Sequence, residues 1–571
     1  MQFHAAILEA NGQLLALRPG KSNSFDDIYV DFQQVEENGG TRWSIFLHPK
    51  TDVTITRLEL QFAAPMPEGT RFFANGYQSW SESKLYELTA NIPVMRSIAR
   101  PYMGRYGDEH IKGIARGRGR LHAWTYTYFK KPGSTLLAGS LSEKTGFTLF
   151  EYNHSSQQFT VSKDLDKLQL AHSFPALDVW IGESTESDVF DAWFQTMGHH
   201  QPKRPPALGW TSWYRHFTQI SEQTVLENTQ GLIDSGLPFE YVQIDDGWQT
   251  HTGDWFSVKP EFPGGMAGVA SKIRQRGFKP GIWIAPFVAS ARSELVRKHP
   301  EWLLKDKNGK PLRVGWNPMW GGWYHALDFY HSGVRDYLSG LFHLAADQWG
   351  FELFKLDFLF AVCLAPPPGK TRGAVMWEAM EFLRNLAGNR KILACGVPLG
   401  ACFGLVDYCR IGGDVHMKWE HRLLAWLRFR ERVSTKASLQ STLGRWQLNG
   451  RAFGNDPDVF ILRTDRQQLT EAQQHTVLTL NSLLGSLLFT SDDLKSYSAE
   501  QQTELESAVE LSNRRIWRVE MLQTDIYLID FELEGVRNFA YCNLTHKPIL
   551  LGDVKILPFE TLLLSRPIAM G

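Results

Sequence analysis

The pattern of apolar and polar positions changes twice along this chain of 571 residues. Up to about residue 195, short segments such as 53–62 alternate apolar and polar side chains, and turn residues separate them. This alternation predicts antiparallel strands with one buried face. The pattern returns in residues 516–522, 526–531, 554–558 and 561–564. We therefore expect an N-terminal β-sandwich and a small C-terminal β-domain.

Between these two regions, apolar strand-like segments alternate with segments that place their apolar residues on one helical face. The strand-like segments are residues 207–213, 240–245, 281–286, 351–360, 391–395, 406–411, 455–462 and 486–490. The longest helix-like segment is 421–439. Eight such units over roughly 290 residues match a (β/α)₈ barrel in number and length. The predicted fold class is therefore α/β, a TIM barrel with a flanking β-domain on each side.

A proline-rich segment separates the first β-region from the barrel. Residues 199–206 contain three prolines, which is typical of a linker. We predict an N-terminal domain at 1–198, the linker at 199–206, the barrel at 207–512 and the C-terminal domain at 513–571.

In a TIM barrel, the chemistry lies at the C-terminal ends of the strands. Aromatic rings and carboxylates gathered at one mouth describe a site for a ligand rich in hydroxyl groups. The sequence places these residues at or just after the predicted strand ends: Trp213, Asp245, Asp246, Trp283, Lys355, Asp357, Cys395, Arg410, Asp414, Asp456, Asp458, Asp492 and Asp493.

Asp357 and Asp414 are the carboxylates that fit glycoside hydrolysis with retention, which needs a nucleophile and a general acid. Lys355 lies two residues before Asp357 on the same face of a strand, and its charge favours an ionised nucleophile. Asp414 could act as the acid if its surroundings keep it protonated. Spacing alone does not exclude the reverse order of roles, and Lys355 and Asp357 could also form a buried salt bridge.

Five motifs resemble those of family 36 glycoside hydrolases, the α-galactosidases. They are Gly-Trp-Thr-Ser-Trp at 209–213, Tyr-Val-Gln-Ile-Asp-Asp-Gly-Trp at 241–248, Lys-Leu-Asp at 355–357, Arg-Ile-Gly-Gly-Asp at 410–414 and Asn-Asp-Pro-Asp at 455–458. The resemblance implies that Asp357 is the nucleophile and Asp414 the acid/base. It also implies that Lys355 bonds ring hydroxyls and that Asp245 and Asp246 bind the 4- and 6-hydroxyls of galactose.

The same resemblance implies further contacts with the substrate. The residues are Arg410 near the 2-hydroxyl, Trp213 and Trp283 at the floor of the pocket, Tyr77 and Trp80 on a loop of the N-terminal domain that reaches over the site, and Cys395. Residues 355–360 and 395–400 depart from the pattern of many members, and the latter segment resembles a compact branch of the family. Contacts at the 2-position and the leaving group therefore stay open.

Simpler interpretations accompany several of these residues. Asp245 or Asp246 could be turn residues before Gly247, and Cys395, Tyr77 and Trp80 could pack in the core. Asp456 and Asp458 fit turn chemistry better than catalysis. Asp492 and Asp493 could cap the following helix.

Composition and motifs reduce the number of protein classes to consider. The net charge of −1 gives no reason to expect nucleic acid or an anionic membrane as a partner. No segment approaches about 18 uninterrupted apolar residues, as a membrane span would need. Five cysteines without CxxC spacing favour a reducing, cytoplasmic location. We find no HExxH, P-loop or GxGxxG motif after a strand, so we expect neither a metal nor a cofactor.

The predicted function is a retaining exo-α-galactosidase that releases terminal α-linked galactose from oligosaccharides by double displacement. Its partner is then a small oligosaccharide, and a homo-oligomer stays open. The alternatives are an α-N-acetylgalactosaminidase or an α-galactosyl transglycosylase of the same family, and, in another class, a sugar-binding protein with an inactive barrel.

Overall fold

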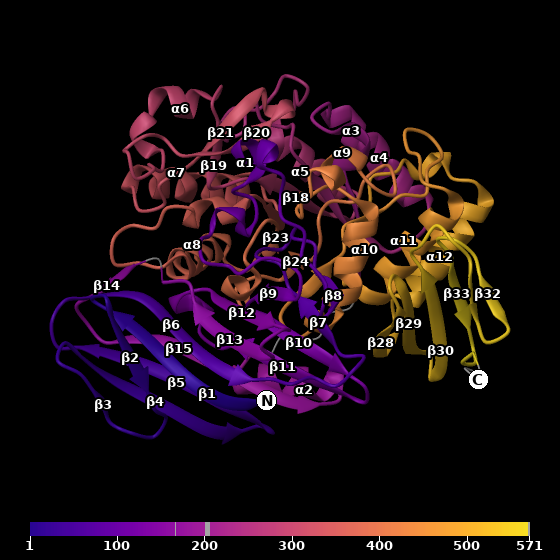
Figure 1. The fold of residues 1–571 in the computed structure, drawn as a ribbon. Coiled ribbons are helices and arrows are strands. Elements are labelled where there is room, and N and C mark those ends of the chain that lie inside the picture. Colours follow the sequence, from indigo (N-terminus) through magenta and orange to yellow (C-terminus); the bar gives the residue numbers. More distant parts are fainter. Residues whose placement is uncertain (166, 200–205, 569–571) are drawn as a thin grey trace.

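The computed structural model describes residues 1–165, 167–199 and 206–568. Figure 1 shows a β-sheet region at the N-terminal end, a central region of strands and helices, and a second β-sheet region at the C-terminal end. This arrangement confirms the predicted fold class. The domain boundaries stay predictions, and most of the predicted linker 199–206 lies outside the described residues.

The N-terminal region contains two antiparallel sheets. One has the strand order β2-β1-β6-β13-β12-β9 with β14 beside β6, and the other has the order β3-β4-β5-β15-β11-β10-β7-β8. The first sheet consists of β1 (Gln2–Ala10), β2 (Gln13–Leu17), β6 (Val53–Ala63), β9 (Arg120–Trp124), β12 (Thr148–Asn153), β13 (Gln158–Lys163) and β14 (Leu168–Leu170). The second consists of β3 (Asn23–Ser24), β4 (Ile28–Glu37), β5 (Gly40–Pro49), β7 (Arg71–Ala74), β8 (Lys84–Glu87), β10 (Tyr126–Lys131), β11 (Ser134–Ser140) and β15 (Phe174–Ser184).

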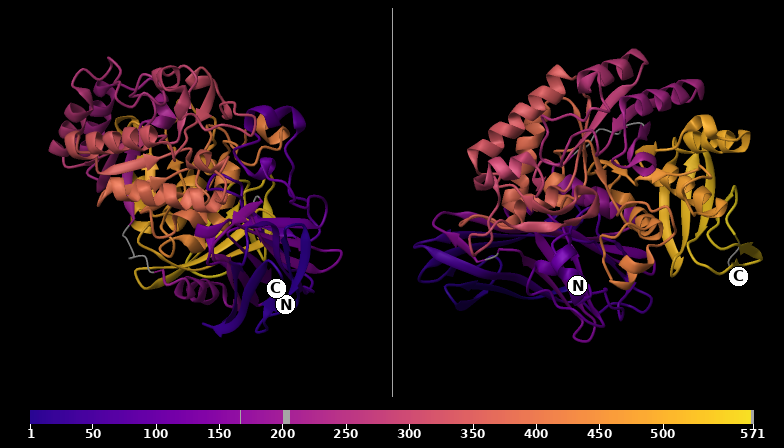
Figure 2. Two further views of the ribbon diagram at one scale, coloured as in Figure 1. Left: turned by 90° about the vertical axis from the view of Figure 1, so that its left-hand side faces the viewer. Right: turned by 90° about the horizontal axis from the view of Figure 1, so that it is seen from above.

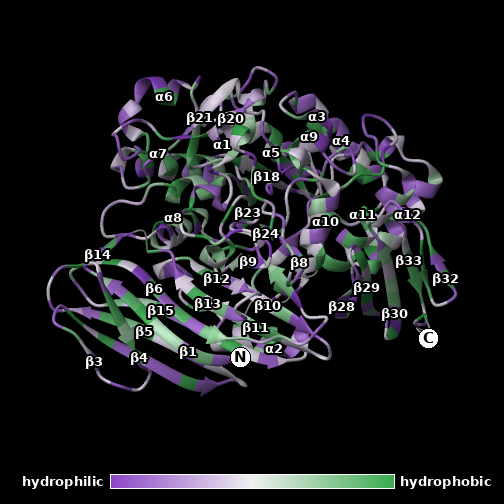
Figure 3. Cartoon of the chain, in the orientation of Figure 1, coloured by the Kyte–Doolittle hydropathy of each residue, from purple (hydrophilic) through white to green (hydrophobic). Residues whose placement is uncertain are grey.

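The alternation read from the sequence explains why these sheets pack together. Leu8 and Leu60 of the first sheet and Val30 and Ile45 of the second are fully buried in one apolar cluster. Figure 3 shows apolar and polar residues alternating along these strands. Helix α2 (Glu186–Thr196) follows the last strand, and Thr185 caps its N-terminus by accepting from the amide of Asp188.

The central region is a closed parallel barrel. Its strands are β16 (Ala207–Thr211), β17 (Phe239–Ile244), β18 (Lys279–Ile284), β22 (Leu353–Leu356), β23 (Lys391–Ala394), β24 (Tyr408–Arg410), β25 (Gly454–Asp456), β26 (Val459–Phe460) and β27 (Leu487–Thr490). Neighbours in this order pair in parallel except β25 and β26, and β27 pairs with both β26 and β16. Strands β25 and β26 share the seventh position, which is interrupted at Pro457 and Asp458.

Helices surround the barrel as the apolar periodicity predicts. They are α4 (Glu222–Asp234), α5 (Gly265–Gln275), α7 (Ser332–His343), α8 (Arg372–Ala387), α10 (Thr435–Gly444), α11 (Glu471–Leu484) and α12 (Ala499–Leu511). Hydroxyl side chains cap several of them, including Ser221 before α4 and Ser434 before α10. No described helix is long and apolar enough to cross a membrane.

Two predicted elements are wrong in part. The helix expected at 421–439 is divided into α9 (Arg422–Trp426) and α10, because Arg428 has a φ of 58° and Ser434 starts a new helix. The strand expected at 351–360 ends with β22, because Phe358 has a φ of 54° and a 3₁₀ turn, Leu359–Cys363, follows. The ends of these segments depend on left-handed residues that apolar periodicity does not reveal.

The barrel also carries a small sheet that the sequence analysis missed. Strands β19 (Val288–Ser290), β20 (Arg313–Asn317) and β21 (Gly322–Ala326) follow β18 and have the order β19-β21-β20. Two short helices, α3 (Trp213–His216) and α6 (Glu294–Lys298), lie in the loops after β16 and β19. This insertion supplies Trp320 and Tyr324 to the site described below.

The C-terminal region is antiparallel. Strands β28 (Arg515–Gln523), β29 (Ile526–Leu533), β30 (Val536–Asn543) and β33 (Thr561–Leu564) form one sheet, and β31 (Ile549–Leu551) pairs with β32 (Val554–Ile556). The apolar pattern did not predict β30 or β31. The β-domain itself is as predicted.

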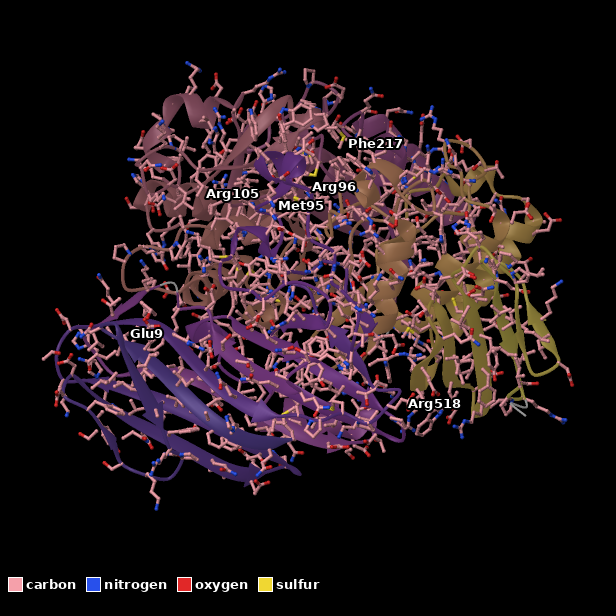
Figure 4. The ribbon with its side chains drawn as sticks, in the orientation of Figure 1. Glu9, Met95, Arg96, Arg105, Phe217 and Arg518 are labelled. Atoms are coloured by element: carbon pink, nitrogen blue, oxygen red, sulfur yellow. The ribbon has the colours of Figure 1, made fainter. Side chains whose placement is uncertain are left out.

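A segment of the N-terminal region reaches the barrel. Helix α1 (Arg100–Met103) lies beside β20 and β21, away from the sheets that precede it in the chain, and Figure 2 shows the same arrangement from a second side. Arg96 and Arg105 of this segment lie among the barrel side chains in Figure 4, whereas Glu9 lies in the distant sandwich. We call residues 95–110 the arm.

Candidate active site

Asp357 lies directly after β22 and is buried, with 9% of its surface exposed. The indole Nε1 of Trp283, on β18, donates to its Oδ2 at 2.9 Å, and the amide of Phe358 donates to its Oδ1 at 3.0 Å. Burial raises the pKa of Asp357 to about 6, although the charge of Lys355 and the bond from Trp283 oppose the shift. The carboxylate therefore stays ionised at neutral pH and is fixed in direction.

Lys355 forms its ion pair with Asp245, on the neighbouring side of the barrel. Its Nζ lies 2.7 Å from Asp245 Oδ2, and both side chains are buried. Burial opposes a charge on Lys355, but Asp245, Cys395 and Asp357 together outweigh it and raise the pKa of the lysine. The buried salt bridge considered from the sequence exists, but its carboxylate is Asp245 and Asp357 takes no part in it. One amine thus orients Asp245 and supplies positive charge near Asp357.

Asp246 is held by two donors that the sequence analysis missed. Trp320 Nε1 donates to its Oδ2 at 2.7 Å, and Gln249 Nε2 donates to its Oδ1 at 2.6 Å. Burial raises the pKa of Asp246 to about 6. Gln249 follows the Asp-Asp-Gly-Trp motif closely, whereas Trp320 comes from the insertion, and no local pattern marks it as part of the site.

Arg410, at the end of β24, contacts a carboxylate with each of its guanidinium nitrogens. Nη1 donates to Asp414 Oδ1 at 2.7 Å, Nε donates to Asp456 Oδ2 at 2.8 Å, and Nη2 lies 2.8 Å from Asp458 Oδ1. Arg410 is 3% exposed, whereas the side chain of Asp414 is 35% exposed. The structure therefore brings Asp456 and Asp458, interpreted above as structural, into one cluster with the predicted acid.

Asp357 and Asp414 influence one another electrostatically. The charge of Asp414 is among the groups that raise the pKa of Asp357. They follow β22 and β24, which both pair with β23, so both belong to the same rim of the barrel. This rim can present both carboxylates to a shared ligand.

The aromatic residues predicted for the site occupy different places. Trp80 packs edge-on against Phe358, the residue after Asp357, at 5.0 Å between ring centroids. Tyr77 is fully buried against Trp124, and its hydroxyl faces the thiol of Cys363 at 3.8 Å. The environment of Tyr77 thus matches core packing between the N-terminal region and the barrel.

Trp213 and Cys395 differ in how far they are exposed to solvent. Trp213 starts α3, is half-buried, and packs edge-on against Phe217. Cys395 follows β23 and is fully buried, and burial raises the pKa of its thiol well above its usual range. The charges of Asp357 and Lys355 act on that thiol, so it lies close to both.

Two tyrosines near Asp357 were not predicted. The charge of Asp357 acts on both Tyr106, from the arm, and Tyr324, from β21, and their pKa values are raised chiefly by burial. Tyr106 and Tyr324 pack edge-on against Phe358 at 6.2 and 5.6 Å between ring centroids. The N-terminal region therefore helps to build the surroundings of Asp357.

The last two acidic residues of the prediction lie elsewhere in the barrel. Asp493 caps the short helix that follows it, as considered above, by accepting from the amide of Lys495. Asp492 does not cap that helix. It forms a buried ion pair with Arg463 and accepts from the hydroxyl of Tyr497 at 2.8 Å.

Known proteins resemble this chain in sequence. The family model described as Melibiase matches residues 198–357. α-Galactosidase AgaA of Geobacillus stearothermophilus is 29% identical over 134 residues, which are 22% of this chain and 17% of that protein. α-Galactosidase 2 of Pediococcus pentosaceus is 27% identical over 318 residues, or 51% of this chain and 40% of that protein. These matches span less than half the length of either relative.

A solved structure resembles nearly the whole chain. TtGalA, an α-galactosidase from Thermus thermophilus, superposes with a TM-score of 0.71 at 27% identity, covering 92% of this chain and 98% of that one. That protein has been solved in complex with p-nitrophenyl α-D-galactopyranoside and with stachyose. The similarity includes the barrel and both flanking β-regions.

Proposed function

We propose that the chain is a family 36 glycoside hydrolase and that it acts as a retaining exo-α-galactosidase, which removes terminal galactose from oligosaccharides. The observation that carries the proposal is the pair Asp357 and Asp414 on one rim of the barrel. Asp357 is buried and oriented by Trp283, and Asp414 is open to solvent. The ligands of TtGalA, an aryl α-galactoside and stachyose, support the choice of sugar.

In the first step, the Asp357 carboxylate attacks the anomeric carbon and the bond to the leaving oxygen breaks. Asp414 gives its proton to that oxygen, so the leaving group departs as an alcohol. In the second step, ionised Asp414 takes a proton from water, whose oxygen attacks the anomeric carbon and releases Asp357. The solvent access of Asp414 suits this second role, because a water molecule must reach it.

The charged residues around this pair suit a neutral sugar. Asp245 and Asp246 are held rigidly by Lys355, Trp320 and Gln249. Fixed carboxylates make strong, directional hydrogen bonds to hydroxyls, and a site built for one epimer rejects another that leaves them unpaired. We assign them to the 4- and 6-hydroxyls of galactose.

The test is turnover of p-nitrophenyl α-galactoside, with the first-formed anomer of galactose identified by NMR. We expect α-galactose from the wild type, no turnover by Asp357→Ala, and a loss of about 10²–10⁴-fold in Asp414→Ala for substrates with poor leaving groups. Azide should rescue Asp357→Ala as the β-azide and Asp414→Ala as the α-azide. Full activity of Asp357→Ala, or β-galactose as the first product, would refute the mechanism. Faster turnover of the N-acetylgalactosaminide would refute the substrate.

A further inference from the structure

Asp458 has no part in the mechanism above, yet it belongs to the same cluster as the acid. Arg410 faces Asp414, Asp456 and Asp458 at 2.7, 2.8 and 2.8 Å. Asp456 and Asp458 are 2% and 1% exposed. One guanidinium cannot balance three carboxylates of which two are buried, so such a cluster retains a proton near neutral pH.

The backbone around Asp458 is shaped to reach this position. Asp458 has a φ of 78°, a left-handed conformation that non-glycine residues rarely adopt. It lies in the interruption between β25 and β26, and its amide donates to Asp456 Oδ1 at 2.9 Å. The strand therefore breaks where the carboxylate must turn toward Arg410.

Asp458 also holds the chain next to the acid. Its Oδ2 accepts from the amide of Val415, the residue after Asp414, at 2.8 Å, and from the hydroxyl of Tyr214. Asp458 is thus linked to Asp414 indirectly in two ways. It accepts from the backbone amide of Val415, and it contacts Arg410, which in turn donates to Asp414. The burial of Asp458 excludes it from contact with substrate.

We propose that Asp458 is a positioning residue for the general acid, which it serves by holding Arg410 and Val415 in place and by keeping the transferable proton on Asp414. This inference rests on the proposed role of Asp414. Without a counter-charge, Arg410 would pull the proton from Asp414, because a cation at 2.7 Å favours the ionised carboxylate. Asp456 and Asp458 offset that cation.

The electrostatics of Asp458 agree with this role. Burial raises its pKa to about 7, the charges of Asp414 and Asp456 add to the shift, and Arg410 and the hydroxyl of Tyr214 oppose it. Asp458 therefore ionises only near neutral pH, so its negative charge acts on Asp414 along the alkaline limb of the pH profile, where the acid must keep its proton. When Asp414 gives up that proton to the leaving oxygen, Arg410 is already in place to pair with the new charge.

The chain contains a matched control. Arg463, Asp492 and Tyr497 form a second buried group of arginine, aspartate and tyrosine, with exposures of 2%, 0% and 7%. Asp492 contacts Arg463 and accepts from Tyr497, much as Asp458 contacts Arg410 and accepts from Tyr214. Asp492→Asn therefore reproduces the loss of a buried carboxylate without touching the acid.

The experiment measures kcat/KM against pH for Asp458→Asn and Asp492→Asn, with p-nitrophenyl α-galactoside and an α-galactosyl disaccharide. We expect the alkaline limb of Asp458→Asn to move to lower pH by about one unit, because a negative neighbour of the acid is gone. The disaccharide, whose leaving group needs the acid, should lose at least about tenfold more than the aryl substrate. Asp492→Asn should leave the limb in place.

A second variant keeps the test decisive if Asp458→Asn does not fold. Asp456→Asn removes the other negative neighbour, and its amide oxygen can still accept from the amide of Asp458. The alkaline limb should move in the same direction. Equal losses on both substrates with an unmoved limb in both variants would overturn the role of Asp458 while wild-type turnover upholds the proposed function. No wild-type turnover would refute both.

Discussion

Single hydrogen bonds decide how the carboxylates of this site behave. Two indoles, Trp283 and Trp320, each donate to one buried carboxylate, Asp357 and Asp246. An indole N–H directs an oxygen without adding charge, so it orients the carboxylate and only partly offsets the cost of burial. Asp357 thereby combines a defined direction with a pKa of about 6.

Removing the indole donor should weaken the nucleophile at low pH. In the proposed mechanism, Asp357 attacks only when ionised, so activity should fall as pH drops through its pKa. Trp283→Phe removes a bond that lowers this pKa, so the acid limb of kcat/KM should move to higher pH by about one unit. The measurement is the pH profile on an aryl α-galactoside. Trp248→Phe is the control, because its indole donates to the backbone of Trp283. An acid limb at the wild-type position in Trp283→Phe would contradict this account.

At the scale of elements, the site depends on where strands stop. Strand β22 ends just before Asp357, and the left-handed Phe358 turns the chain so that its ring meets Trp80. After β23, Gly396 has a φ of 61°, and a Cβ placed there would lie 3.0 Å from the Trp80 ring. A side chain at position 396 would therefore displace the loop of the N-terminal region that covers this side of the barrel.

Gly396→Ala tests this packing. The left-handed backbone should cost about 1–2 kcal/mol, and contact with Trp80 about 1–3 kcal/mol more. The matched control is Gly236→Ala, where φ is 68° and nothing lies within 4 Å of the added Cβ. Thermal unfolding measures both costs, and KM for the galactoside should rise only in Gly396→Ala. Equal destabilisation by the two substitutions would show that the Trp80 ring moves aside without a cost in free energy.

The N-terminal region and the barrel are joined through buried charged groups. Arg445 of the barrel donates to Asn75 Oδ1 at 2.9 Å and to the carbonyl of Ser79 at 2.6 Å. Ser81 donates to Glu431, which is 9% exposed. Burial raises the pKa of Glu431 to about 7, although Arg430 and the bond from Ser81 oppose it. The stability of the contact between the N-terminal region and the barrel should therefore depend on pH.

Glu431 should make the whole molecule less stable as pH rises. Its pKa is higher folded than unfolded, so its favourable contribution is complete below pH 4.5 and is lost as pH rises to about 7. Glu431→Gln cannot ionise, so above pH 7 it should be more stable than the wild type by about 3 kcal/mol. Thermal unfolding from pH 4 to 8 checks this, with the exposed Glu510→Gln as control. A constant difference across that range would contradict it.

How much the sequence could predict differs between fold and site. Alternation and helical periodicity are local, so they identified the barrel strands and the β-regions on either side. The breaks at Phe358 and Arg428 were not predicted, because a left-handed residue changes the path of the chain without changing the apolar pattern. Asp245, Lys355 and Asp357 were identified because polar residues at strand ends stand out against apolar strands.

The sequence by itself determined the order of strands and helices and the strand ends that carry charge, because burial acts on every segment through its own pattern of side chains. Only the tertiary structure decided the partners: Lys355 pairs with Asp245, Trp320 with Asp246, and Asp458 with Arg410. A charged or polar group in a low-dielectric interior takes whatever partner the fold brings within about 3 Å, and that partner can lie a hundred residues away.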